Sequence, residues 1–328
     1  MIISWNTTNR CNLTCNHCYR DAGEKLDGEL NTQEAKTLLT QIARAGFKIM
    51  IFSGGEPLVR EDIFELIEYA SKLGLRPVIG TNGTLITPNI ANKLKTAQVS
   101  AVGISLDSLT PSKHNSFRGY NEAFKDTIYG MKNCRDAGLR FQIHTTVMDW
   151  NKDEIIDMTD FAIAMGAAAH HIFFLVPTGR GKKIEKEMLD SSEYENLLIS
   201  IMKKQQEVDI EIKPTCAPQF TRIAEEIGTK IRFSRGCLAG INYCIVNPKG
   251  EVQPCAYLYE VAGNVRETPF HIIWKESELL NKLRTLNYKG SCGICTYQKS
   301  CGGCRARAAY YNSGDYMAEE NLCKYSSS

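Results

Sequence analysis

Residues 10–19 read Arg-Cys-Asn-Leu-Thr-Cys-Asn-His-Cys-Tyr, and this stretch carries three cysteines with the spacing C-x3-C-x2-C. The cysteines are Cys11, Cys15 and Cys18. They directly follow the apolar, β-branched run 2–8, which predicts a strand. A [4Fe-4S] cube that is bound by three thiolates keeps one iron open for a ligand that is not protein. The spacing therefore favours a catalytic iron-sulfur site over a closed zinc site, which needs a fourth protein ligand where only His17 lies near.

This motif, with His17 at its aromatic position and Tyr19 directly after it, resembles the signature of radical S-adenosylmethionine (SAM) enzymes. In that family the open iron chelates the amino and carboxylate groups of SAM. Reductive cleavage then releases a 5'-deoxyadenosyl radical, which abstracts a hydrogen atom from the substrate. The resemblance implies that the cluster and SAM supply the chemistry, while the protein binds and orients them and excludes competing reactions. It also implies that the three cysteines are catalytic as well as metal ligands.

Length and composition are those of an ordinary globular protein. The 328 residues are 43% hydrophobic and 23% charged, and the formal net charge is +2, so no nucleic-acid or anionic membrane partner is expected. No apolar run approaches the roughly 18 residues of a membrane span, and no leader of an exported protein is recognisable. Thirteen cysteines in such a chain favour metal binding in a reducing cytoplasm.

The first 180 residues alternate between short β-branched runs and segments with helical apolar spacing. The predicted strands are 2–8, 48–54, 76–83, 101–107, 141–147 and 170–177. The predicted helices between them are 32–45, 63–73, 90–95, 121–137 and 154–165. After these units we expect one more helix at 194–206 and a strand at 208–213. Six such units predict an α/β fold with parallel strands, an open partial (β/α)6 barrel of the TIM type, or alternatively a doubly wound sheet. Both folds place a site at the carboxyl ends of the strands.

Several predicted strands end in residues that suit a SAM pocket. Ser53-Gly54-Gly55-Glu56-Pro57 follows the second strand, where paired glycines let the backbone approach a ligand. The third strand ends at Asn82, and the fourth ends in Ser105 and Asp107. The first of these segments resembles the GGEP motif that contacts the SAM amino group in radical SAM enzymes. The resemblance implies that SAM is bound by Tyr19, Gly54, Gly55, Glu56, Asn82, Ser105, Asp107 and Arg118.

From about residue 191 this alternation stops, and eight further cysteines gather in the C-terminal part. They are Cys237, Cys244, Cys255, Cys292, Cys295, Cys301, Cys304 and Cys323. Residues 245–252 between them predict a hairpin with its turn at Pro-Lys-Gly. Such a small domain has little core of its own, so bound metal would be needed to stabilise its fold. Zinc ions could stabilise it as well as iron-sulfur clusters could. Cys134 is predicted as a buried core thiol, and Cys216 as a loose ligand or a residue without a metal role.

The late cysteine pattern resembles the SPASM extension of radical SAM enzymes, which holds auxiliary [4Fe-4S] clusters. The resemblance implies one or two such clusters, bound by the eight late cysteines. The usual second group ends C-x3-C, whereas Cys301 to Cys304 is C-x2-C, so the division of ligands between clusters stays open. We therefore expect a radical SAM partial barrel at 1–213 and a SPASM-like domain at 214–328.

The segments 2–11, 19–23 and 47–57 resemble the radical SAM enzymes of modified-tetrapyrrole synthesis, which act in heme d1 and siroheme-dependent heme formation. Within this group the resemblance is strongest to the Fe-coproporphyrin III synthases. It implies removal of the two acetate side chains of 12,18-didecarboxysiroheme and a low-potential electron donor such as ferredoxin or flavodoxin. A substrate with several carboxylates would be bound by cationic side chains at the site. The candidates are Arg118, Arg180, Lys182, Lys183, Arg305 and Arg307.

Three alternatives share part of this pattern. One is another side-chain modification of a heme d1-type tetrapyrrole. A second is a peptide-modifying SPASM enzyme, which makes thioether or carbon-carbon crosslinks or matures a sulfatase. The third is a non-catalytic iron-sulfur scaffold or electron carrier, which would not need Gly54-Gly55-Glu56-Pro57 or the pair Ser105 and Asp107. Reductive cleavage of SAM by the reconstituted protein separates this third class from the enzymes.

Overall fold

The computed structural model describes residues 1–325, and its framework is one ten-stranded sheet in the order β10-β9-β8-β1-β2-β3-β4-β5-β6-β7. Strands β1 to β7 are parallel to their neighbours, β8 is parallel to β1, and β9 and β10 are antiparallel. The strands are β1 (Ile2–Asn6), β2 (Ile49–Ser53), β3 (Arg76–Thr81), β4 (Ala101–Ser105), β5 (Phe141–Val147), β6 (Ala169–Phe174), β7 (Glu211–Thr215), β8 (Tyr243–Val246), β9 (Glu251–Gln253) and β10 (Gly263–Asn264). Because β7 and β10 form its two edges, the sheet does not close.

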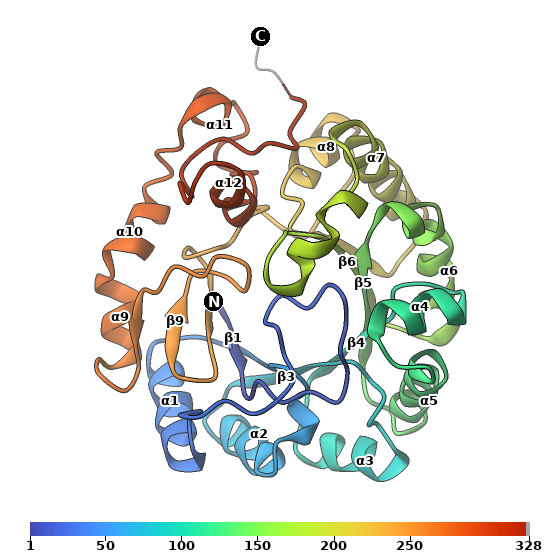
Figure 1. The fold of residues 1–328 in the computed structure, drawn as a ribbon, viewed down its shortest axis with the longest axis vertical. Helices are drawn as coiled ribbons and strands as arrows, with labels where there is room; N and C mark the ends of the chain where they lie inside the picture. The colour runs from blue at the N-terminus through green and yellow to red at the C-terminus, as the bar shows by residue number, and fades with distance from the viewer. Residues whose placement is uncertain (326–328) are drawn as a thin grey trace.

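Helices cover the outer face of this curved sheet, as Figure 1 shows. The helices are α1 (Thr32–Arg44), α2 (Ile63–Lys72), α3 (Pro88–Thr96), α4 (Pro111–Arg118), α5 (Ala123–Asp136), α6 (Ile155–Met165), α7 (Ser191–Glu207), α8 (Phe220–Glu226), α9 (Phe270–Glu276), α10 (Glu278–Arg284), α11 (Gly290–Ile294) and α12 (Arg305–Tyr311). Short 3-10 segments are η1 (Pro57–Val59), η2 (Asp149–Glu154) and η3 (Gly179–Glu187). The predicted α/β partial barrel is confirmed, and the further strand predicted at 208–213 forms as β7, parallel to β6.

Local signals explain where these elements begin and end. Helix α1 starts at a capping box, in which the Asn31 side chain accepts from the backbone N–H of Glu34 and the Glu34 carboxylate accepts from that of Asn31. Helix α6 ends at Gly166, whose φ of 78° is left-handed and therefore favours glycine. In β5 the side chains alternate strictly between buried and half-buried positions, as expected for a strand with two different faces.

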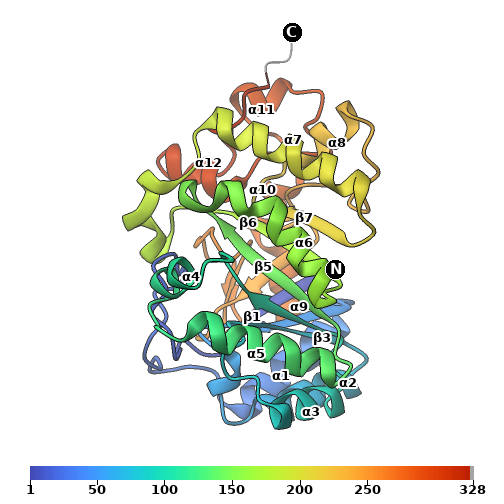
Figure 2. The ribbon, with the colours of Figure 1, turned by 90° about the vertical axis from the view of Figure 1, so that its right-hand side faces the viewer.

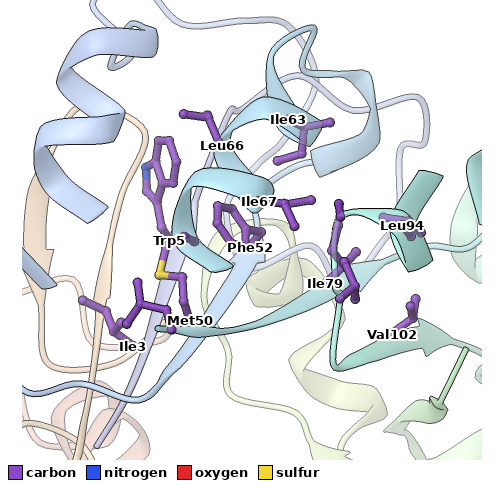
Figure 3. Packing of buried hydrophobic residues seen from close by; sticks show 14 of the residues in the cluster. Ile3, Trp5, Met50, Phe52, Ile63, Leu66, Ile67, Ile79, Leu94 and Val102 are labelled. Atoms are coloured by element: carbon purple, nitrogen blue, oxygen red, sulfur yellow. The ribbon is translucent and has the colours of Figure 1, made fainter. Parts of the chain in front are cut away.

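The largest hydrophobic core lies between the outer face of the sheet and its helices. Figure 3 shows side chains of β1 and β2, among them Trp5 and Phe52, packed against Leu66 and Ile67 of α2. All four are fully buried. Figure 2 shows α5 and α6 lying across the strands of the other half of the sheet. This packing fixes the carboxyl ends of the strands, where the site is built.

The C-terminal part of the chain shares its sheet with the N-terminal part. The predicted hairpin forms β8 and β9, and β8 pairs with β1 in a register that sets Ile3 opposite Cys244. The predicted domain boundary at residue 213 falls inside β7, and the last three positions of the predicted second domain lie outside the described residues. The division into two domains stays a prediction. Within residues 1–325, no helix has both the length and the apolar character needed to cross a membrane.

Candidate active site

The three cysteines of the first motif lie in the loop that leaves β1, near the middle of the sheet order. The Cys11 N–H donates to the Gly23 carbonyl oxygen at 2.8 Å, and the Ala22 N–H donates to the Cys18 Sγ at 3.4 Å. Burial raises the pKa of the Cys11 thiol to about 12. Since a metal ligand must be a thiolate, metal binding itself has to favour the deprotonated form here. Among residues 1–325, no three His, Cys, Asp or Glu side chains converge on the position of a single metal ion.

The paired glycines after β2 bind the backbone of this cysteine loop. The Gly55 N–H donates to the Thr8 carbonyl oxygen at 2.8 Å, and the Glu56 N–H donates to the Arg10 carbonyl oxygen at 2.9 Å. A Cβ atom on Gly54 would lie 2.5 Å from the Thr8 carbonyl oxygen, and one on Gly55 would overlap the carbonyl of Arg10. The glycines are therefore required by the close approach of one backbone segment to another, which the motif alone did not reveal.

Glu56 is fully buried and holds the ends of two strands together. Its carboxylate accepts from the Thr81 hydroxyl at 2.8 Å, from the Asn82 N–H at 2.9 Å and from the Leu58 N–H at 3.1 Å. Burial raises the pKa of this carboxyl to about 7, while these donors oppose the rise. In this arrangement the side chain positions η1 and the end of β3, and the predicted contact of Glu56 with SAM stays a prediction.

Asn82 and Ser105 also make contacts within the protein. The Asn82 Nδ2 donates to the Asn12 Oδ1 at 2.8 Å, and the Asn12 Nδ2 donates to the Thr84 hydroxyl at 2.9 Å. The Ser105 hydroxyl donates to the Thr81 carbonyl oxygen at 3.3 Å. Asn12 was not singled out from the sequence, although it stands inside the cysteine motif and carries both a donor and an acceptor. These bonds tie the cysteine loop to the ends of β3 and β4.

A buried ion pair lies directly behind Cys15. The Arg118 Nε donates to the Asp107 carboxylate at 2.6 Å, and the Arg118 Nη1 lies 3.9 Å from the Cys15 Sγ. Although burial alone would raise the pKa of Asp107, the Arg118 guanidinium holds it well below the usual range. The fully buried Asp107 also accepts from the Thr146 N–H at 3.0 Å. The pair thus places a positive charge beside a predicted thiolate ligand and links it to β5.

Arg180 and Tyr19 complete the packing around the cysteine loop. Arg180 donates through Nε to the Cys15 carbonyl oxygen and through Nη1 to the Ala22 carbonyl oxygen, each at 2.8 Å. The Tyr19 hydroxyl lies 3.0 Å from the side-chain amide of Asn6, with which it forms a hydrogen bond. The Arg180 guanidinium is therefore occupied by the loop, which changes its predicted role as a substrate cation.

Two further predicted substrate cations also bind protein groups. Arg305 is 1% exposed and donates to the Ala318 carbonyl oxygen at 2.7 Å. Arg307 is fully buried and donates to the Glu320 carboxylate at 2.8 Å. A cation buried with its own partners cannot also receive a substrate carboxylate without breaking them. Of the six predicted cations, Lys182 and Lys183 are the ones with exposed side chains.

The later cysteines separate in space. Four of them line one cavity, namely Cys292, Cys295, Cys301 and Cys323. Cys304 and Cys255 pack in a different cluster, together with Leu258 and Cys216. Cys244 lies apart from both groups in β8, fully buried in the large core. Its position in the sheet turns the Cys244 side chain toward the helices, away from both groups of thiols. The predicted role of Cys244 as a metal ligand therefore stays a prediction.

Comparisons with known proteins fit this arrangement. Residues 5–162 match the model of the radical SAM superfamily, and residues 237–305 match SPASM, an iron-sulfur cluster-binding domain. The chain is 44% identical over 338 aligned positions to the AdoMet-dependent heme synthase of Methanosarcina barkeri, covering 99% of this chain and 96% of that protein. The chain belongs to the radical SAM superfamily. The predicted family, its enzymatic nature and its SPASM extension are thereby confirmed.

Two more distant likenesses complete the comparison. The Fe-coproporphyrin III synthase of the same organism is 30% identical over 351 positions, covering 98% of this chain and 87% of that protein. The SuiB protein of Streptococcus suis, solved bound to S-adenosylmethionine, superimposes with a TM-score of 0.78 at 19% identity, covering 98% of this chain and 77% of that one. The radical SAM domain binds a [4Fe-4S] cluster and SAM, and the SPASM domain binds auxiliary clusters. The three thiols of the β1 loop and the two groups of later thiols fit these cofactors, since thiolates are the usual ligands of iron-sulfur clusters.

Proposed function

We propose that this protein is a cytoplasmic radical SAM enzyme that forms heme from an iron porphyrin. The observation that carries the proposal is a difference in identity within one organism. The chain is 44% identical to the AdoMet-dependent heme synthase of Methanosarcina barkeri, but 30% identical to its Fe-coproporphyrin III synthase. Both relatives match nearly the whole chain, so the difference does not come from partial coverage. It favours heme formation over the acetate removal that the short sequence segments suggested.

The chemistry of the two named products defines the reaction. Fe-coproporphyrin III carries four propionate side chains, whereas heme carries two propionates and two vinyl groups. Each converted side chain changes from R–CH2–CH2–COO⁻ to R–CH=CH2 by losing one hydrogen atom, one carbon dioxide and one electron. The cluster and SAM, when bound, supply the 5'-deoxyadenosyl radical that takes the hydrogen atom. The electron passes to a one-electron acceptor of the iron-sulfur class.

The chain's own residues would then bind and orient the two ligands. We propose that SAM lies at the strand ends beside Tyr19, Gly54, Gly55 and Asn82, close to the cysteine loop. Lys182 and Lys183 are exposed in η3, the segment whose Arg180 N–H donates to the Cys18 carbonyl oxygen at 2.9 Å. These lysines lie close to the loop and suit the propionates of a porphyrin. We keep the division at residue 213 and a low-potential donor such as ferredoxin or flavodoxin as parts of the proposal.

The test is turnover of two separate substrates under anaerobic conditions. Protein with reconstituted clusters is incubated with SAM and dithionite, and either Fe-coproporphyrin III or 12,18-didecarboxysiroheme is added. Heme formation predicts a product lighter than Fe-coproporphyrin III by two carbon dioxide molecules and four hydrogen atoms, together with 5'-deoxyadenosine. Turnover of 12,18-didecarboxysiroheme alone would instead establish the deacetylase. If neither tetrapyrrole reacts although SAM is cleaved, both tetrapyrrole functions are excluded and a peptide substrate takes their place.

A further inference from the structure

The concave face of the sheet, which is turned away from the covering helices, is lined by side chains that solvent reaches. In β5 the positions on this face, Gln142, His144 and Thr146, are half-buried, whereas the positions between them are buried. Strands β2 and β7 show the same alternation. The parallel strands of a filled barrel are buried on both faces. The concave face of this sheet is therefore open to a ligand.

Two histidines lie on this face but leave it uncharged. The ring of His144 in β5 stacks on that of His171 in β6, with centroids 5.1 Å apart and an angle of 5° between the planes. A Cβ atom on Gly103 of β4 would lie 2.2 Å from the His144 Cε1, so the ring edge between the two nitrogens rests on the backbone of β4. Burial lowers the pKa of both histidines. The pair is therefore neutral near neutral pH, and His144 packs against the strand instead of presenting a nitrogen to a ligand.

Lys213 places a cation beside these histidines. It stands opposite His171 in the register of β6 and β7. Its neighbour Ile212 belongs to the hydrophobic cluster beneath α7, so the Lys213 side chain points to the concave face. The Lys213 Nζ lies 4.2 Å from the centroid of the Phe233 ring. The ring attracts this cation through its quadrupole but does not neutralise its charge.

Within residues 1–325, no carboxylate lies within ion-pair distance of the Lys213 Nζ. Glu211, two positions earlier on the same face, has its carboxylate 3.4 Å from the His171 Nε2 and 3.9 Å from the Arg232 Nη1. Burial lowers the pKa of the Lys213 ammonium, and the charge of Glu211 opposes this only in part. A half-buried ammonium without a counter-charge carries a desolvation cost that an anionic ligand would offset.

We propose that Lys213 binds a propionate of the porphyrin substrate, and that this is one of the two propionates that heme formation retains. The inference rests on the proposed function, because it needs a substrate with carboxylates. Fe-coproporphyrin III carries four of them, while Arg305 and Arg307 are engaged with protein groups. Lys182 and Lys183 are exposed and suit carboxylates that stay near the surface. Lys213 supplies the cation on the concave face itself.

The choice of a retained propionate follows from the reaction. A converted side chain loses its carboxylate as carbon dioxide, so the negative charge on that group disappears on the way to the product. A cation paired with this carboxylate would stabilise the reactant more than the transition state and would slow the step. A retained propionate keeps its charge throughout. Lys213 can therefore hold it during both conversions without opposing either.

The experiment measures binding of two metal-free porphyrins to the full chain with its clusters reconstituted. Coproporphyrin III carries all four propionates, and protoporphyrin IX carries the two retained ones. Both are fluorescent and neither contains iron, so quenching of their emission on titration reports binding without iron ligation. SAM and reductant are left out, which prevents turnover. Lys213→Met should weaken binding of both porphyrins by about ten- to a hundredfold, the factor expected for a hydrogen-bonded ion pair.

Three further variants separate the charge from the fold. Lys213→Arg keeps the charge and should bind both porphyrins nearly as tightly as the wild type. Lys213→Gln removes the charge but keeps a polar end, and it replaces Lys213→Met if that variant does not fold. Lys230→Met is the matched control and should bind as the wild type does, because Lys230 is exposed in the loop that also carries Phe233. Iron content and circular dichroism check the clusters and the fold of each variant.

The outcomes distinguish this inference from the proposed function. Wild-type affinity in a folded Lys213→Met or Lys213→Gln protein would overturn the inference alone. A loss confined to coproporphyrin III would also overturn it, because Lys213 would then hold a propionate that is converted. A loss in Lys213→Arg as large as that in Lys213→Met would overturn it as well, since the charge would not be what binds. A wild-type protein that binds neither porphyrin would overturn the proposed function and the inference with it.

Discussion

At the level of single residues, Arg180 illustrates how the cysteine loop is held. Its guanidinium donates to the carbonyl oxygens of Cys15 and Ala22, and hydrogen bonds from a charged group contribute about 1.5–3 kcal/mol each. We predict that Arg180→Met loosens the loop and speeds the loss of iron from the first cluster to a chelator. Lys186→Met is the matched control, because Lys186 is exposed in the same segment. Equal rates of iron loss in the two variants would show that Arg180 does not hold the loop.

His170 gives a prediction for pH at the same scale. Its ring nitrogens lie 2.9 Å from the hydroxyls of Thr145 and Thr159, and burial lowers the pKa of this histidine to about 3. An unfolded histidine has a pKa of about 6.5, so below that pH the unfolded chain binds a proton that the folded chain does not. Stability contributed by neutral His170 is therefore fully present above pH 6.5 and is lost as the pH falls. Between pH 8 and pH 6 the loss should be about 1 kcal/mol.

The measurement compares denaturant unfolding of the wild type and His170→Gln at pH 8 and pH 6. The variant should be less stable at pH 8, since it loses buried hydrogen bonds, but its stability should fall less toward pH 6. His271→Gln serves as control, because His271 is exposed in α9. A variant at His170 with the same pH dependence as the wild type would mean that His170 does not stay neutral in the folded state.

At the level of elements, the turn after β2 decides where the cysteine loop lies. We predict that Gly55→Ala displaces the loop, because its methyl group would overlap the carbonyl of Arg10 and lie 2.7 Å from that of Asn9. The variant should bind less iron at the first site and form less 5'-deoxyadenosine. Gly23→Ala is the matched control, since a Cβ on Gly23 meets nothing within 4 Å and Gly23 contacts the same loop. Full iron in Gly55→Ala would show that the loop can move without cost.

The elements also show what sequence alone could predict. The six predicted strands all form, because each is a β-branched run that alternates with an amphipathic helix. Helix α4 was not predicted, since its eight residues are mostly polar and offer no apolar period. It is held instead by the cysteine loop: the Asn16 N–H donates to the Phe117 carbonyl oxygen at 2.9 Å, and the ring of His17 stacks on that of Phe117 with centroids 4.1 Å apart. Such contacts leave no local pattern in the sequence.

The same limit applies to the site. The cysteines and paired glycines were found because their spacing is local and their chemistry restricts the residue type. The role of Arg180 was not found, because its acceptor on Cys15 is 165 positions away and is a backbone carbonyl that any residue would offer. Likewise Cys216 and Cys304 come together only through the path of the chain between β7 and α12. A motif thus reports the ligands it contains, but not the long-range partners that position them.

At the scale of the whole molecule, the two matched regions are joined through the central strand β1. One edge of β1 pairs with β2 and the other pairs with β8, which lies about 240 positions later in the chain. The loop that leaves β1 carries the first three cysteines. The core residues Ile3 and Trp5 pack in the same cluster as Val246 and Phe270. The C-terminal part therefore supports the strand from which the cysteine loop departs.

This arrangement predicts that the barrel region cannot stand alone. A chain that ends at residue 213 would lose the last two residues of β7 and all of β8, leaving the backbone groups of β1 unpaired along one edge. It would also uncover Ile3 and Trp5, and burial of such large apolar side chains contributes roughly 1.5–3 kcal/mol each. Exposed strand edges flanked by apolar surface favour association between chains. We expect this fragment to aggregate, as measured by size-exclusion chromatography, under conditions in which the full 328-residue chain stays in solution. A monomeric fragment that unfolds cooperatively and binds about four irons would instead show that the barrel is an independent domain and that β8 is an addition to a finished sheet.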